Sequence, residues 1–256
     1  MRIKQVRNAT LRLDFGGVKF LVDPYLAKKD AYPGFDGTVN SHIRNPRLEL
    51  QTPMEEILGV DAVIVTHTHP DHWDEAAVQL APKHLPLFAQ HERDADLIRS
   101  QGFSDVRILT EETTFRGVSL IKTRGQHGTD EALAAAKEVL GEVCGVVFTH
   151  PDERTLYLAG DTIWNGYVAS NLASYEPEIV VLNAGDAQVQ GLGSIIMGTE
   201  DVKKVHQAAP QAILIASHME AVNHSVLSRT ELRSFAAESG MGDRLLVPED
   251  DQAYTF

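Results

Sequence analysis

Apolar and polar positions alternate with a period of two near the start of the chain, and give way to longer apolar runs further on. Thr10 to Phe15 alternates, Gly16-Gly17 follows, and Val18 to Asp23 resumes the alternation, which predicts a β-hairpin. The runs Ile179 to Leu182 and Ala212 to Ala216 are apolar throughout, as in buried strands. The pattern therefore predicts hairpins first and strand–helix units later.

Helical periodicity appears between the strand-like runs. Helices are expected at 74–80, 92–100 and 200–208, and Asp201 suits a cap or a first-turn acid. Further strands are expected at 87–89, 106–109, 115–123, 143–149 and 155–159. By itself this pattern supports an α/β or α+β class without deciding between them.

Composition favours one soluble domain covering residues 1–256. Hydrophobic content is 43% and charged content 23%, ordinary values for a globular protein. No apolar run approaches the roughly 20 residues needed to cross a bilayer, and Met1 to Val6 does not resemble a signal peptide, so a cytoplasmic protein is expected. Cys144 is the single cysteine, which excludes an intrachain disulfide.

The formal net charge is −13, from 23 basic and 36 acidic residues. Nucleic-acid binding needs clustered lysine and arginine, so this balance disfavours it. The expected partner is a small molecule, and neither nucleic acid nor membrane. Self-association as a homo-oligomer is compatible with the sequence.

A dense group of potential metal ligands follows the apolar run Val63 to Val65. His67 and His69 are two positions apart, so in extended chain both imidazoles point the same way. Asp71 and His72 come after Pro70, where the chain turns, and can approach from another side. Imidazole and carboxylate are costly to bury without partners, so the cluster predicts a metal site.

The stretch Thr66 to His72 resembles the HxHxDH motif of the metallo-β-lactamase superfamily. The resemblance implies three further ligands at later strand ends, namely His127, Asp161 and His218. It implies a first site of His67, His69 and His127, a second of Asp71, His72 and His218, and Asp161 between the two ions. It also implies a four-layer αββα sandwich of two packed mixed β-sheets with helices on the outer faces.

Two divalent ions, with zinc expected first and manganese or iron as alternatives, can share a water and lower its pKa. The sequence thus predicts a hydrolase acting on a small ester, lactone or phosphoester, with Asp71 and His224 as catalytic residues. A weaker resemblance is to the ascorbate-phosphate lactonase-like branch. The alternatives are a di-iron redox protein or a non-catalytic metal-dependent binding protein. Redox members resemble HxExD, whereas position 69 is histidine.

Several residues keep two interpretations. His224 lies six positions beyond His218 and competes with it as last ligand; otherwise it is a substrate contact or proton donor. Asp23 either orients a ligand histidine or forms a turn. Asn183 either contacts substrate or shapes the backbone. Arg44 is the candidate contact for an anionic substrate.

Two segments are candidates for walls of a binding cavity. Residues 24–53 form a long, turn-rich stretch, which predicts a lid or binding loop. Residues 188–199 contain three glycines that would let backbone approach a ligand.

Overall fold

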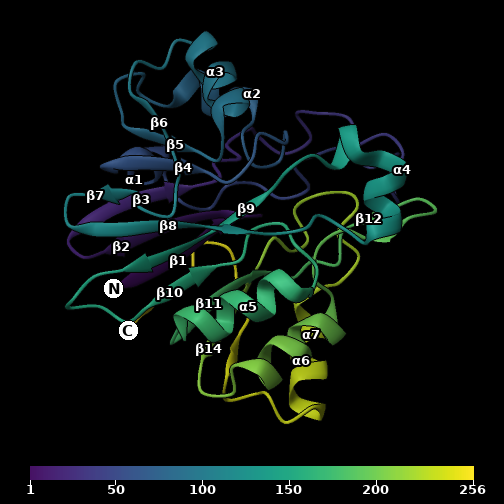
Figure 1. Ribbon diagram of the computed structural model, residues 1–256. Helices are drawn as coiled ribbons and strands as arrows, with labels where there is room; N and C mark the ends of the chain where they lie inside the picture. Colours follow the sequence, from purple (N-terminus) through teal and green to yellow (C-terminus); the bar gives the residue numbers. More distant parts are fainter.

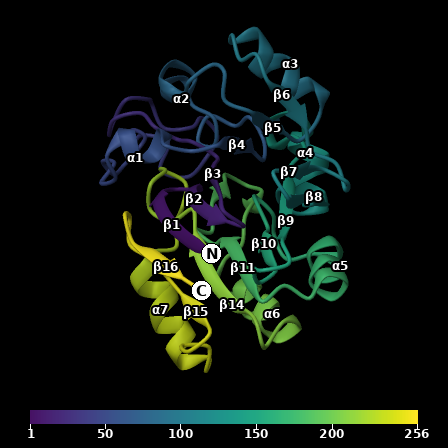
Figure 2. The same cartoon turned by 90° about the vertical axis from the view of Figure 1, so that its left-hand side faces the viewer.

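The computed structural model describes residues 1–256 as four layers. Two seven-stranded sheets pack face to face, and helices lie on the outer face of each (Figures 1 and 2). α1, α2 and α3 cover one sheet, whereas α5, α6 and α7 cover the other. The predicted αββα sandwich is confirmed.

The first sheet has the order β16-β1-β2-β3-β4-β5-β6. Its β1–β2–β3 part is antiparallel and its β3–β4–β5–β6 part is parallel. The predicted hairpin is confirmed: Phe15 pairs with Val18, and Gly16 and Gly17 have φ of 55° and 75°, which glycine adopts without strain. The strands are β1 (Arg2–Arg7), β2 (Thr10–Phe15), β3 (Val18–Val22), β4 (Ala62–Val65), β5 (Leu87–Ala89), β6 (Val106–Ile108) and β16 (Ala253–Thr255).

The second sheet has the order β15-β14-β11-β10-β9-β8-β7. The single strand expected at 115–123 is wrong: Arg116 and Gly117, at φ of 49° and 88°, turn the chain and split it into the β7–β8 hairpin. The strands are β7 (Thr114–Phe115), β8 (Val118–Arg124), β9 (Cys144–Thr149), β10 (Leu156–Leu158), β11 (Ile179–Asn183), β14 (Ile213–Ser217) and β15 (Leu245–Leu246). A separate pair joins β12 (Gln188–Val189) and β13 (Gly193–Ser194).

The expected helices are present, and four others are added. α2 begins after its cap Asp74, and Asp201 lies in the first turn of α6. The sequence analysis did not predict α1, α4, α5 or α7. The helices are α1 (Met54–Leu58), α2 (Glu75–Leu80), α3 (Glu92–Ser100), α4 (Asp130–Leu140), α5 (Gly166–Tyr175), α6 (Thr199–Ala208) and α7 (Arg229–Glu238).

The main core lies between the two sheets and contains 22 buried apolar residues. Phe148 is central to it, with its ring centroid 5.6 Å from those of Phe15 and Phe20. Separate apolar clusters lie under the two helical layers. In the second sheet β8, β10 and β14 run in the same direction, so the carboxyl ends that lead into their ligand loops lie at one edge of that sheet.

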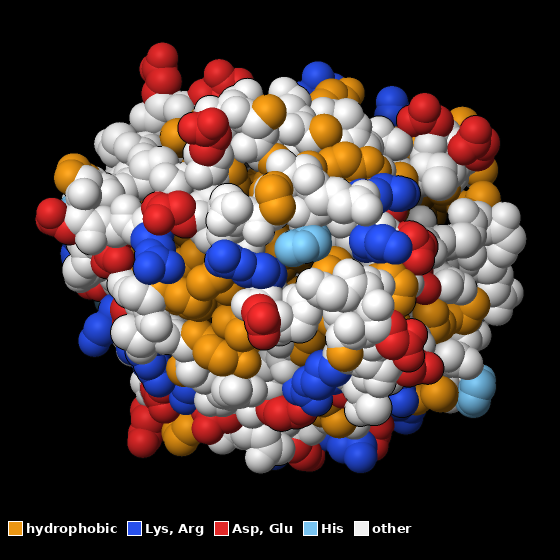
Figure 3. All heavy atoms as spheres, turned by 90° about the horizontal axis from the view of Figure 1, so that it is seen from below, with side chains coloured by type: hydrophobic (Ala, Val, Ile, Leu, Met, Phe, Trp, Pro, Cys, Tyr) orange, Lys and Arg blue, Asp and Glu red, His pale blue; other side chains and the backbone are white.

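The surface carries charges of both signs close together. In the view from below, lysine and arginine side chains lie among aspartate and glutamate, with apolar patches between them (Figure 3). On this face the basic residues therefore do not gather into one continuous patch.

Candidate metal centre

Seven predicted ligands meet at the edge where the two sheets come together. The first sheet contributes the loop after β4, and the second sheet contributes the ends of β8, β10 and β14. All are buried except His69, which is half-buried. They are His67, His69, Asp71, His72, His127, Asp161 and His218.

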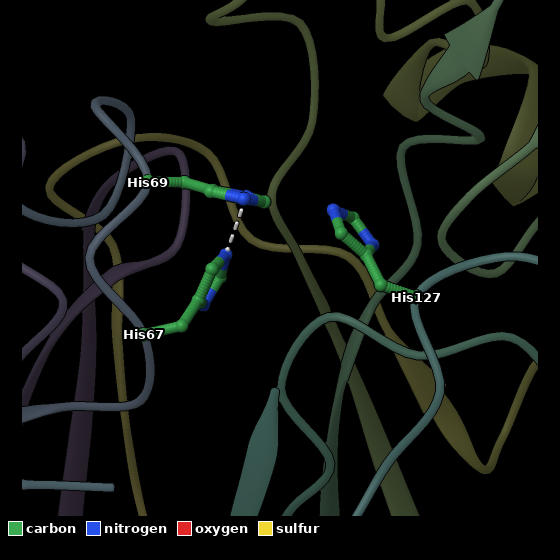
Figure 4. A group of neighbouring side chains, drawn as sticks. All are labelled: His67, His69 and His127. Atoms are coloured by element: carbon green, nitrogen blue, oxygen red, sulfur yellow. Dashed lines mark hydrogen bonds between the residues drawn. The ribbon is translucent and has the colours of Figure 1, made fainter. Parts of the chain in front are cut away.

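Three imidazoles form the first group. His67, His69 and His127 each place a ring nitrogen within 4.8 Å of the others'. His67 Nε2 lies 3.0 Å from His69 Nδ1, and His127 approaches from the other side (Figure 4). Three nitrogens facing a common point suit one tetrahedral metal ion with an open position.

The second group contains Asp71, His72 and His218, whose ligand atoms again lie within 4.8 Å of one another. His218 Nε2 is 3.1 Å from Asp71 Oδ2. Of the two candidates for the last ligand, His218 lies in this group, whereas His224 belongs to neither group.

Asp161 lies between the groups. Its Oδ2 is 3.1 Å from His72 Nε2, and 3.7–3.8 Å from the Nε2 atoms of His67, His127 and His218. One carboxylate oxygen thus faces imidazoles of both groups, as a bridging ligand would.

Partners outside the cluster determine which ring nitrogen faces inward. His127 Nδ1 donates to Ile195 O at 2.9 Å, and His69 Nε2 donates to Val139 O at 3.0 Å. In a neutral imidazole the other nitrogen then carries the lone pair, and it faces the cluster. These side chains therefore fit divalent cations.

Electrostatics agree with that donor set. Burial lowers the pKa of His127 to about 4 and that of His67 well below its usual value, so both are neutral at pH 7. Burial alone would raise the pKa of Asp161, but His72 and His218 outweigh it and hold that pKa well below its usual range. The neutral nitrogens of His67 and His127 beside an ionised carboxylate are ligands that zinc and related ions prefer. His72 differs: the carboxylates of Asp161, Asp23 and Asp71 outweigh its burial and hold its pKa well above the usual value.

Asp23 orients His72, which confirms one of its two interpretations. Its Oδ2 lies 3.0 Å from His72 Nδ1, and its two oxygens accept from the amide and hydroxyl of Thr66 at 2.7 Å each. One buried carboxylate therefore holds the start of the motif and a ring near its end.

Asn183 contacts Asp161 instead of having the role of a substrate contact. Its amide donates to Asp161 Oδ1 at 2.6 Å, which leaves Oδ2 facing the imidazoles. Sequence reasoning missed Asn8, whose Nδ2 donates to Asp71 O at 3.1 Å. Its only signal was a position just before the predicted strand that begins at Thr10, and in the structure it adopts a φ of 54°.

A cavity of about 220 Å³ opens onto both groups. Phe35 and Thr38, from the predicted binding loop, line it, as do Val189 and Ile195 from the second predicted wall. His224 also lines it, with its ring centroid 5.2 Å from that of Phe35.

Arg44 does not reach this cavity. Its guanidinium is exposed and donates to Asp30 O at 2.8 Å and Ala31 O at 3.1 Å. The prediction that Arg44 contacts an anionic substrate is therefore wrong, because its side chain donates to backbone carbonyls of its own loop.

No helix in the structure has both the length and the apolar content that a membrane span requires.

Comparisons with known proteins agree with this geometry. Residues 19–219 match the model of the Beta-lactamase superfamily domain. UPF0173 protein YddR of Bacillus subtilis (strain 168) is 48% identical over the full length of both chains. A UPF0173 metal-dependent hydrolase of Methylobacterium nodulans is 23% identical, also over both full lengths.

A crystal structure of the isothiocyanate hydrolase from Delia radicum gut bacteria superposes with a TM-score of 0.98 at 50% identity, covering 100% of this chain and 99% of that one. A structure of a possible metal-dependent hydrolase from Veillonella parvula DSM 2008 gives the same TM-score and coverage at 43% identity. This chain therefore belongs to the beta-lactamase superfamily, as a metal-dependent hydrolase of the UPF0173 family.

Proposed function

We propose that this chain hydrolyses isothiocyanates at a centre of two divalent ions, with zinc expected first and manganese or iron as alternatives. The observation that supports two ions is the position of Asp161 Oδ2, within 3.8 Å of imidazoles from both groups. The substrate follows from the 50% identity, over the whole chain, with an isothiocyanate hydrolase. Similarity to named hydrolases also favours hydrolysis over the redox alternative.

The reaction balances with one water. An isothiocyanate R–N=C=S and H₂O give the amine R–NH₂ and carbonyl sulfide: a C–O bond forms at the central carbon, the C–N bond breaks, and both protons of water end on nitrogen. Bound divalent ions would supply Lewis acidity that lowers the pKa of the attacking water and polarises the substrate.

The protein's own groups orient the reactants and move protons. Asp71 and His224, both predicted to be catalytic, line the cavity beside the cluster. Burial lowers the pKa of His224 to about 4, so the ring is neutral and can accept a proton from water. Its Nδ1 is buried and has no hydrogen-bond partner in the protein.

The test is release of amine and of carbonyl sulfide from phenethyl isothiocyanate by the metal-loaded protein. Asp161→Asn should reduce kcat/KM by a factor of 100 or more, since a bridging charge is lost. The exposed Asp96→Asn is the matched control and should leave it unchanged. Failure of the wild-type protein to release either product would contradict the substrate assignment.

Metal content tests the binuclear proposal separately. Elemental analysis should give two ions per chain in the wild-type protein, and about one in His69→Ala and in His218→Ala, which each remove a ligand from one group. Exposed His42 provides the control substitution to alanine. One ion in the wild-type protein would contradict two sites.

A further inference from the structure

Three cavities border the histidine cluster, and only one of them touches both ligand groups. The largest, of about 680 Å³, meets the cluster only at His127. Another, of about 300 Å³, meets it at His67 and His69. The cavity of about 220 Å³ contacts His69 and His127 of the first group, Asp71 of the second, and Asp161. A substrate reacting between the groups therefore enters from this cavity.

The walls of this cavity are apolar and come from three separate parts of the chain. Phe35 belongs to the loop after β3, Val139 and Leu140 to the end of α4, and Val189 and Ile195 to the β12–β13 region. Val139 is 71% exposed, which is unusual for a valine and places an apolar side chain at the mouth. Apolar walls converging above a polar floor orient a substrate whose substituent is apolar.

The charged residues of the cavity are all acidic apart from histidine. Asp71 and Asp161 lie in the floor with the other ligands, and no lysine or arginine lines the walls. Asp36 is exposed, lines the cavity, and forms no ion pair. Bound ions would offset the charge of Asp71 and Asp161, so the uncompensated charge in the wall is that of Asp36, and a substituent bearing a carboxylate or phosphate would meet it with no lysine or arginine beside it.

We infer that the substrate's organic group is small, apolar and uncharged, and that Asp36 selects against anionic substituents. This inference rests on the proposed function, from which it takes the isothiocyanate as the reacting group. The volume lies below the roughly 300–1,000 Å³ of sites for drug-sized ligands, so the substituent is one ring or a short chain. The phosphorylated and anionic substrates expected from the sequence are therefore disfavoured.

The first experiment compares kcat/KM for three isothiocyanates: methyl, phenethyl, and phenethyl with a para-carboxylate. In the metal-loaded wild-type protein, phenethyl should exceed methyl by roughly 10- to 100-fold, because the ring is removed from water. Val139→Ser should reduce that ratio several-fold, whereas Val226→Ser, at a valine 40% exposed and outside the cavity, should not.

The charge test uses Asp36. The neutral compound should be preferred over its para-carboxylate, and Asp36→Asn should reduce this preference about two- to fivefold, the size expected of one exposed charge. Asp36→Lys should reduce it further, and Asp96→Asn should leave it unchanged. An unchanged preference in Asp36→Lys would overturn the inference.

A binding measurement separates this inference from the proposed reaction. Ligand-observed NMR on the metal-loaded protein compares 3-phenylpropanamide with its para-carboxylate, neither of which needs to react. Preference for the neutral amide, weakened in Asp36→Lys and Val139→Ser, supports the cavity assignment even if no isothiocyanate is hydrolysed. Equal or tighter binding of the carboxylate would overturn it, whatever the enzyme hydrolyses.

Discussion

At the scale of single residues, the candidate metal centre depends on buried polar side chains that orient its ligands through hydrogen bonds. Asp23 accepts from Thr66 and holds His72, and Asn183 holds Asp161. Asp23, Thr66 and Asn183 do not line the cavity. Their effect is to direct lone pairs inward, which makes the ligands ready for an ion before it binds.

Asp23→Asn should weaken metal binding without unfolding the protein. The amide keeps an oxygen that can accept from Thr66, but an N–H facing His72 Nδ1 can no longer accept its proton. Loss of such a partner typically lowers metal affinity by about 10- to 100-fold. Competition with a chelator measures the change.

Asp61→Asn is the matched control, because Asp61 accepts from Lys19 N far from the ligands. Equal affinities of Asp23→Asn and the wild-type protein would show that Asp23 does not orient His72 in solution.

Cys144 should be unreactive in the folded protein. It is fully buried, and burial raises the pKa of its thiol to about 12, so almost no thiolate forms at pH 8. A chromogenic disulfide reagent should titrate no thiol in the native state and one per chain in urea. Rapid native labelling would mean that β9 opens readily.

At the scale of elements, the loops that carry ligands are held by the helices that follow them. Asp74 ends the ligand loop after β4 and caps α2 by accepting from Ala77 N at 2.7 Å. Its other oxygen accepts from Leu26 N and Ala27 N at 3.0 and 2.8 Å. A single carboxylate thus joins α2, the metal motif and the start of the long loop after β3.

Asp74→Ala should destabilise the protein by about 3 kcal/mol, the sum of a lost cap and two buried amides left without an acceptor. Ser228→Ala, which removes the capping box of α7, should cost only about 1 kcal/mol. Urea denaturation of the metal-free proteins measures both. Equal losses would indicate that Leu26 and Ala27 find other acceptors.

At the scale of the whole molecule, the ligands connect the two halves of the sandwich. The first sheet supplies the motif after β4, and the second supplies His127, Asp161 and His218. An ion bound between them therefore links segments that are otherwise joined through the apolar core. Binding to the native state alone raises the free energy of unfolding by mass action.

Removal of metal should lower the melting temperature. At a free ion concentration 1,000 times Kd, binding contributes about 4.1 kcal/mol, which corresponds to a shift on the order of 10 °C in a chain of this size. Calorimetry with and without chelator measures it. The double variant His69→Ala, His218→Ala should show little dependence on chelator; a full shift in that variant would place the stabilising ion elsewhere.

Much of this architecture could be predicted from the sequence, because local patterns of apolar residues and turns agree with the fold. The hairpin around Gly16-Gly17 needs only alternation and a turn that accepts positive φ. The helix at Glu92–Ser100 and the strand at Leu87–Ala89 have the predicted bounds. The ligand motif was equally visible, since its spacing is local and its residue types are costly to bury without an ion.

Only the tertiary structure decided what depends on long-range contact. That the ring of His218 approaches Asp71, and that Arg44 does not reach the cavity, both depend on how distant segments pack. The apolar cavity with Asp36 joins three segments with no shared pattern. Local periodicity determines elements and motifs, whereas side chains from distant segments share a site only once the packed sheets bring them together.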